Sequence, residues 1–289
     1  MIATFLESVK AIPKVLLLSL CIAASGVEAA NIAGQVELVE GEVKIVDAKG
    51  SERIPQVGDK VFEGDMLQSG INGELHVHML DDAFIALRAN TQLKIETYQA
   101  QGVASDSAVL SLLKGSFRSI TGWIGKLNRK NYKVQTLNAN LGIRGTDHEP
   151  LFVPETDALE IEANPPGTYD KVNSGGTVIE SAFGVIEVAP DQVGYAPLRG
   201  APRLLPRTPA FYQRAKHERK IDEKKDQLQR NNDESVQNFR RDSTRGGEAP
   251  EGAKPVRKLE QLKDAIDADP PSPPEIRHRR ERRPPRPPK

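Results

Sequence analysis

The apolar residues before residue 208 never follow a sustained helical period, and this pattern constrains the fold of the chain more than any other feature. They lie in short runs that alternate with polar residues. The runs at 75–79 and 85–87 flank a turn signal and predict a hairpin. Further strands are predicted at 91–98 and at 109–120, the second interrupted at Gly115. Because parallel βαβ units need crossover helices, the sequence predicts an all-β fold of two packed sheets, either a sandwich or a short solenoid.

The charge balance divides the chain into two parts. The whole chain carries 40 Lys and Arg against 40 Asp and Glu, but residues 201–289 carry 23 against 15, a net charge of +8, which leaves −8 on residues 1–200. Thirteen of the 21 prolines also lie after residue 200. Such a segment cannot bury enough apolar surface to offset the entropy of ordering it. We therefore expect the β-domain to end near residue 200 and a charged, largely disordered tail to occupy 201–289.

Residues 1–30 have the organisation of a signal peptide. Lys10 and Lys14 precede an apolar run at 15–24, and small residues follow at Ala29 and Ala30. This predicts export to the periplasm, with cleavage near Ala29 or Ala30. An uncleaved membrane anchor is the alternative, but the run has about half of the roughly 20 apolar residues that a span requires.

The only cysteine, Cys21, lies within this segment and follows Leu20 rather than a small residue, so lipidation is not expected. The mature chain would then have no cysteine, which excludes disulfides and zinc-thiolate sites. No cofactor is predicted.

The stretch 132–149 contains the most distinctive turn of the chain. Gly142 and Gly145 frame Arg144 between two predicted strands. Glycine is used where the backbone takes a positive φ or passes close to another segment, so this turn is expected to aim the arginine. We predict a binding site here, formed by Arg144, Gly145, Thr146 and His148. The alternative is a structural role in which the guanidinium caps backbone carbonyls inside the β-domain.

A series of short motifs occurs in a fixed order between residues 34 and 153. The series comprises Gly41-Glu42-Val43, Val57-Gly58-Asp59, Gly64-Asp65, Ser69-Gly70-Ile71-Asn72-Gly73, Leu80-Asp81-Asp82, Leu113-Lys114-Gly115-Ser116-Phe117-Arg118, Val134-Gln135-Thr136 and Gly142-Ile143-Arg144-Gly145-Thr146. In this order the chain resembles the FecR-type periplasmic domain. It departs from the family pattern at Asp82-Ala83, where Gly-Ser is usual, and at Leu137, where proline is common.

The resemblance implies an organisation and a class of partner. It places the FecR-type β-domain at 31–155, and residues 156–200 are predicted to be a hairpin-rich extension of the same domain. Family members that regulate iron uptake hold a sigma factor with a cytoplasmic arm and contact an outer-membrane transporter with their periplasmic part. Because a signal peptide precedes the domain, we expect a stand-alone exported member without that arm. Its expected function is a non-enzymatic binding or signalling-scaffold module for an envelope receptor or regulator.

Two histidines of one predicted strand allow a metal-site hypothesis. His76 and His78 point to the same face, and Asp81 or Asp82 follows, as in sites of two histidines and one carboxylate. Polar residues on the solvent face of a strand are a simpler interpretation, so no metal is predicted.

Enzyme activity is not expected. His148 and Glu149 could act as an acid and a base, but a hydrolase also needs a nucleophile or a metal-bound water, and no G-x-S-x-G elbow is present. The only tryptophan, Trp123, is a candidate ligand platform, with a core or rim anchor as the favoured interpretation.

Residues 209–241 are predicted to form a charged, solvated helix that begins at the Thr-Pro pair at 208–209. Its apolar residues are sparse. The near seven-residue spacing of Ile221, Leu228 and Val236 also allows a weak coiled-coil seam.

The chain ends in an arginine- and proline-rich segment at 279–289, which has a polyproline bias and a strong positive field. Its expected partners are anionic: cell-wall polymer, lipopolysaccharide, lipid or an acidic protein surface. A solubilising tail without a partner is the alternative. Nucleic acid fits the charge, but the export signal argues against it. A cell-envelope structural protein tethered to anionic polymer or lipid by this tail is therefore the alternative function, and an envelope enzyme is a third.

Overall fold

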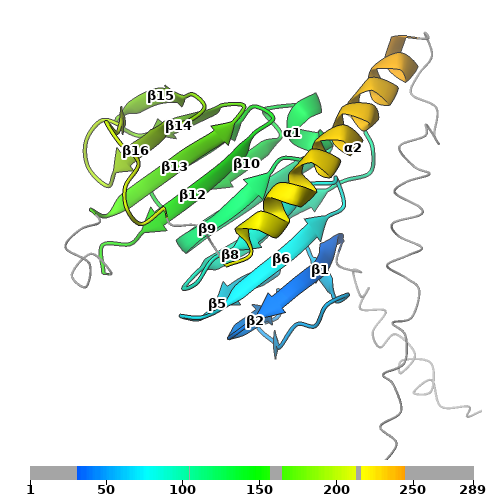
Figure 1. The fold of residues 1–289 in the computed structure, drawn as a ribbon, viewed down its shortest axis with the longest axis horizontal. Coiled ribbons are helices and arrows are strands. Elements are labelled where there is room, and N and C mark those ends of the chain that lie inside the picture. The colour runs from blue at the N-terminus through cyan, green and yellow to red at the C-terminus, as the bar shows by residue number, and fades with distance from the viewer. Residues whose placement is uncertain (1–30, 104, 157–164, 213–215, 245–289) are drawn as a thin grey trace, which may run out of the picture. The chain divides into compact units, whose positions relative to one another are not determined.

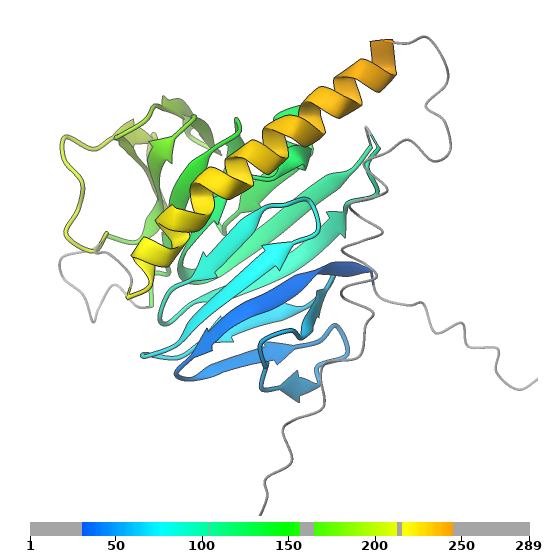
Figure 2. The ribbon, with the colours of Figure 1, turned by 45° about the vertical axis from the view of Figure 1, so that its right-hand side comes forward.

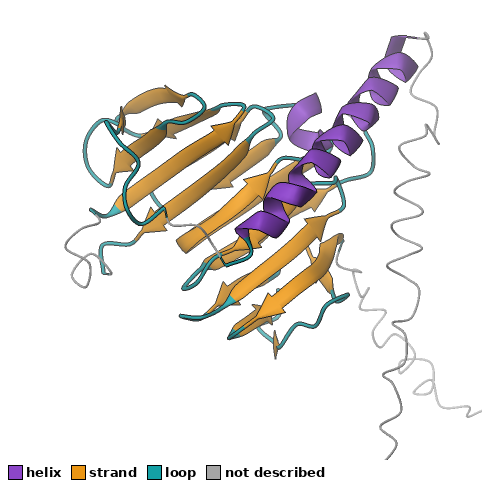
Figure 3. Cartoon of the chain, in the orientation of Figure 1, coloured by secondary structure: helices purple, strands orange, loops and turns teal. Residues whose placement is uncertain are grey.

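The computed structural model describes residues 31–103, 105–156, 165–212 and 216–244, with side chains given as far as Gln237. The predicted signal peptide and the part of the predicted tail after residue 244 lie outside these residues. Seventeen strands and two helices make up the described part. The prediction of an all-β domain followed by a charged helix is confirmed (Figures 1 and 3).

The strands form one continuous mixed sheet that folds into two layers, which share the long strand β9 (Ser107–Ile120). Sheet A has the spatial order β4 (Lys60–Phe62), β1 (Ile32–Glu40), β6 (Glu74–Met79), β7 (Phe84–Leu87), β9, β12 (Asp147–Val153), β13 (Gly167–Ser174), β16 (Val193–Pro197) and β17 (Arg203–Leu204). Sheet B has the order β3 (Glu52–Arg53), β2 (Val43–Val46), β5 (Met66–Ser69), β8 (Gln92–Gln99), β9, β10 (Tyr132–Gln135), β11 (Ala139–Ile143), β14 (Thr177–Ser181) and β15 (Gly184–Val188). The pairing of β9 with β10 is parallel, and the other neighbouring strands in these two orders pair antiparallel.

Strand β9 passes from one layer to the other at Gly115, which has φ +81°. Residues before the glycine pair with β8 and β10 of sheet B, and residues from 115 onward pair with β12 and β7 of sheet A. A Cβ at this position would lie 2.5 Å from the carbonyl oxygen of Asn90. The interruption predicted at Gly115 is therefore the joint between the two layers.

The main core lies between the layers and takes one residue in two from most strands. Sheet A contributes Leu75, Val77, Ile85, Leu87 and Phe117, and sheet B contributes Leu67, Leu93, Ile95, Leu110, Leu112, Val134 and Leu141. The period-two alternation in the sequence is the direct cause, because successive side chains on a strand point to opposite faces. The predicted hairpin appears as β6 and β7, and the hairpin-rich extension predicted at 156–200 contains the hairpin of β14 and β15.

Two helices complete the described part. The short α1 (Trp123–Leu127) follows β9, and its Trp123 is buried in the core, as the anchor interpretation predicted. The long α2 (Glu218–Thr244) crosses the outer face of sheet A (Figures 1 and 2). Within the described ranges, no helix is both long enough and apolar enough to cross a membrane.

The prediction of a solvated helix at 209–241 is wrong in two respects. The helix begins at Glu218, not at Pro209, because Phe211 and Tyr212 pack against the aromatic side chain of Tyr169 and its neighbours on sheet A. The hydroxyl of Tyr212 also donates to the backbone oxygen of Glu149 at 3.0 Å.

The second difference is that α2 is packed rather than solvated. Ile221, Leu228 and Val236 are all buried against the β-domain, the first two beside Phe84, Ala86 and Ile120 of sheet A. These three residues would have formed the coiled-coil seam. They are buried against the β-domain instead and are not exposed for a coiled coil.

Candidate functional site

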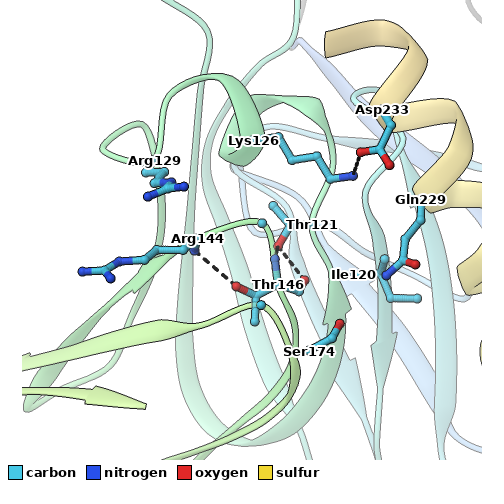
Figure 4. Close-up of a pocket in the computed structure, with 11 residues that line it drawn as sticks. Ile120, Thr121, Lys126, Arg129, Arg144, Thr146, Ser174, Gln229 and Asp233 are labelled. Atoms are coloured by element: carbon cyan, nitrogen blue, oxygen red, sulfur yellow. Dashed lines mark hydrogen bonds and ion pairs between the residues drawn. The ribbon is translucent and has the colours of Figure 1, made fainter. Parts of the chain in front are cut away.

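A pocket of about 400 Å³ lies where the turn after β11 meets α1, the turn after β13 and α2 (Figure 4). It is lined by Ile120, Thr121, Lys126, Arg129, Arg144, Gly145, Thr146, Ser174, Gly175, Gln229 and Asp233. Three of the four residues predicted to form a binding site are in this lining. The pocket is named the Arg144 pocket below.

Reciprocal hydrogen bonds fix the turn at Arg144. The backbone nitrogen of Arg144 donates to the oxygen of Gly176 at 3.0 Å, and the hydroxyl of Thr146 donates to the same oxygen at 2.8 Å. Thr121 donates its hydroxyl to the backbone oxygen of Thr146 at 2.8 Å, and the backbone nitrogen of Thr146 donates to that hydroxyl at 3.1 Å. The turn at Arg144, which forms one wall of the pocket, is therefore attached to Thr121, the residue directly after β9.

Two glycines allow the walls to approach one another. Gly145 has φ +66° and Gly175 has φ +80°. A Cβ on Gly175 would lie 2.5 Å from the backbone oxygen of Gly145, so the two turns can touch only because glycine is present. The framing role predicted for Gly145 is confirmed, whereas Gly142 lies within β11, paired with Lys133 and Val178.

Positive charge dominates the pocket. Figure 4 shows Arg129 and Arg144 on one side and the ion pair of Lys126 with Asp233 on the other. Among the described lining residues, Asp233 is the only carboxylate, and it lies 2.7 Å from Lys126. Arg129 is exposed and makes no hydrogen bond or ion pair with the described residues.

The structural alternative, in which the guanidinium of Arg144 caps backbone carbonyls, is not found among the described residues. The guanidinium pairs with the carboxylate of Glu187 on β15 at 2.7 Å, and both side chains are solvent-accessible. Because exposed ion pairs contribute about 0–1 kcal/mol, this contact exchanges readily with another anion.

The prediction that His148 belongs to the same site is wrong. His148 is on the inner face of β12 and is fully buried, with its Nδ1 2.8 Å from Asp170. Adjacent residues of a strand point to opposite faces, so Asp147 and Glu149 face α2 while His148 faces the core. His148 and Glu149 therefore lie on opposite faces of the sheet.

His76 and His78 share the outer face of β6, as the strand period predicted, but each has its own carboxylate. His76 lies 2.7 Å from Glu74, and His78 lies 3.1 Å from Glu37 and 3.2 Å from Asp82. In the parts of the chain that the structure describes, no group of three potential metal-binding side chains is found.

A second polar cluster lies between sheet A and α2. Arg118 makes a bidentate contact with Asp147, at 2.8 Å and 2.7 Å, and also contacts Glu218 and Asp222 of the helix. Lys225 of the helix lies 2.7 Å from Asp147. This cluster attaches the first half of α2 to the sheet.

The environment of this cluster shifts the pKa values of its acids. Burial alone would raise the pKa of Asp147, but the hydrogen bonds and charges of Arg118 and Lys225 lower it to about 2. Burial likewise opposes ionisation of Glu149, whose pKa is nevertheless lowered by the charges of Arg88 and Lys171. Both carboxylates are therefore ionised at neutral pH.

Sequence reasoning missed several residues of the two sites. Lys126 and Arg129 come from α1 and the loop after it, and Asp233 comes from α2, so no local motif joins them to Arg144. Arg118 is on the outer face of β9, where it contacts Asp147 and α2, but the helix that covers this face could not be located from sequence.

Comparison with known proteins gives distant structural similarity. No protein-family model and no curated protein matches this chain. Two crystal structures of a candidate anti-sigma factor from Parabacteroides distasonis ATCC 8503 are similar at 12% and 11% identity, with TM-scores of 0.39 and 0.38, over 50% of this chain and 60% of theirs. A cell surface anchoring domain has 22% identity and a TM-score of 0.21 over 22% of this chain and 82% of that domain. The chain thus spans 60% of the length of the anti-sigma factor structures.

Proposed function

We propose that this chain is a non-enzymatic, exported binding module that acts as a signalling scaffold in the cell envelope, and that the Arg144 pocket takes an acidic group of a partner protein. The observation that carries the proposal is the charge of the pocket. Lys126, Arg129 and Arg144 line a space to which the described lining supplies one carboxylate, Asp233. Glu187 from outside the lining pairs with Arg144, so Arg129 is the cation left without a partner among the described residues. A carboxylate from a partner would balance the remaining positive charge of the pocket.

The chemistry of the cations supports this choice of ligand. A guanidinium presents a planar fork that matches a carboxylate in a bidentate contact, and Arg129 has no partner among the described residues. The backbone around Arg144 is fixed by the Thr121–Thr146 hydrogen bonds, so less conformational entropy is lost on binding.

The lining also supports binding rather than catalysis. Among the described lining residues, hydroxyl groups come from Thr121, Thr146 and Ser174, but no histidine is present to act as a base beside them. Asp233, the only carboxylate among the described lining residues, forms an ion pair with Lys126.

Calorimetric titration of the exported chain with a short oligo-glutamate peptide tests the proposal. We expect Arg144→Glu and Arg129→Glu each to weaken binding by at least about tenfold, because each replaces an attraction of about 1 kcal/mol by a repulsion. Arg199→Glu is the matched control, since Arg199 is exposed beyond the end of β16 where Pro197 pairs with Gly167, away from Ser174. Equal loss in all three variants would show non-specific charge attraction and would contradict the proposal.

A second experiment addresses the expectation that the chain is not an enzyme. The purified chain is incubated with cell-envelope substrates, and turnover is compared between wild type and Arg144→Glu. Turnover that the Arg144 substitution removes would overturn the assignment as a binding module.

A further inference from the structure

The Arg144 pocket already contains one carboxylate, and it comes from the chain itself. Asp233 on α2 reaches Lys126 on α1 at 2.7 Å, while its own side chain remains 66% exposed. Gln229, one turn earlier on the same face of α2, completes that wall of the pocket. The chain therefore presents to the pocket the type of group that the proposed partner would present.

Among the described side chains of α2, most ion pairs with the β-domain come from the first half of the helix. The first half is held by Glu218, Asp222 and Lys225 in the cluster around Arg118, and by the buried Ile221.

Between 229 and 237, the later part of α2 whose side chains are described, the helix makes fewer ion pairs with the β-domain. The amide of Asn232 donates to backbone oxygens of Asp82 and Thr121 at 3.2 Å and 3.4 Å, and Val236 is buried. Among the described side chains of this segment, the remaining polar contact with the domain is the ion pair of Asp233 with Lys126. Because this ion pair is partly exposed and weak, a competing carboxylate can replace it at small cost, whereas separation of the whole segment would also break the buried contacts of Asn232 and Val236.

We infer that Asp233 is an internal competitor for the Arg144 pocket: its carboxylate holds Lys126 until an acidic group of a partner replaces it, and residues 229–237 of α2 then lose this attachment to the domain. This inference rests on the function proposed above and assigns that site its regulation. Lys126, Arg129 and Arg144 line the same pocket, so an acidic group bound there also attracts the lysine that Asp233 holds.

Binding and release are reciprocal. If ligand binding displaces Asp233, then removal of the Asp233 charge must raise the affinity for ligand by the same coupling free energy. The residue also repels an incoming anion, which adds to the competition.

Asp233→Asn tests the inference, with Asp226→Asn as the matched control on an exposed position of the same helix. We expect Asp233→Asn to bind the oligo-glutamate peptide about threefold to tenfold more tightly than wild type, and Asp226→Asn to bind as wild type does. If wild type binds and Asp233→Asn binds with the same affinity, the internal competitor is refuted while the proposed function stands. If neither binds the peptide, the proposed function fails and the inference fails with it.

Hydrogen exchange of the helix amides gives the second readout. Saturating peptide is expected to accelerate exchange at 229–237 and to leave 218–225 unchanged. Unchanged exchange at 229–237 would contradict the loss of the Asp233 attachment on binding, even if the affinity change were found.

Discussion

Substitution of Arg118 by methionine should destabilise the protein far more than removal of a charge from an exposed ion pair. Arg118 lies on the outer face of β9 and is 4% exposed, and its partner Asp147 is 1% exposed. Methionine preserves the aliphatic stem and the packing under α2 but removes the bidentate contact. The substitution therefore leaves the buried carboxylate of Asp147 with Lys225 as its remaining cation.

The size of the loss follows from this geometry. Removal of one partner from a buried ion pair costs about 3–5 kcal/mol, since the other charge stays buried without compensation. Lys225 retains part of the compensation, so the expected loss is about 3 kcal/mol. Arg144→Met is the control because its pair with Glu187 is exposed, and its expected loss is below about 1 kcal/mol.

Urea denaturation at neutral pH measures both losses as changes in the free energy of unfolding. A loss below about 1 kcal/mol for Arg118→Met would rule out this explanation, because it would show that the cluster under α2 is solvated and that the helix is not docked through it. Equal losses for both variants would also contradict it.

Three further results are expected. Arg144→Lys should leave the free energy of unfolding within about 0.5 kcal/mol by urea denaturation, since the guanidinium makes no buried contact; a larger loss would restore the structural interpretation of this residue. Gly115→Ala should cost at least about 1–3 kcal/mol in the same assay because of its positive φ, and a neutral effect would mean that β9 does not bend there. The pH dependence has two parts. The pKa of Asp147 is lowered from 3.8 to about 2, so its contribution to stability is present above pH 4 and is lost as the pH falls toward 2. Burial opposes protonation of His78, but hydrogen bonds to Asp82 and Glu37 raise its pKa above 6.5, so its contribution is present below pH 6.5 and is lost as the pH rises through the folded value. Denaturation of His78→Gln at pH 5.5 and pH 8 should remove this second dependence, and a retained dependence would assign it to another group.

The fold could be predicted from the sequence because the strands are marked locally. Alternation at 75–79 and 85–87 and the glycine at 115 specify strands, faces and a break without reference to the rest of the chain. The start of α2 could not be predicted, because local capping at Thr208 is overridden by the packing of Phe211 and Tyr212 on sheet A. Tertiary contacts of this kind have no local signal.

The candidate site was predictable in part for the same reason. The glycines at 142 and 145 are a local signal, and Arg144, Gly145 and Thr146 do line a pocket. His148 is adjacent in sequence but opposite in direction, and the register of β12 that decides this is set by its partners β9 and β13. The helix that supplies Asp233 is distant in sequence. The resemblance to the FecR-type domain stays a prediction, since the similar structures are distant.

Binding of an acidic partner group by the Arg144 pocket can be measured without knowledge of the partner. Wild type, Arg144→Glu and Arg199→Glu are titrated calorimetrically with the oligo-glutamate peptide at physiological ionic strength. We expect saturable binding by wild type, loss of at least about tenfold in affinity for Arg144→Glu and unchanged affinity for Arg199→Glu. Binding by Arg144→Glu that equals wild type would contradict the proposed function.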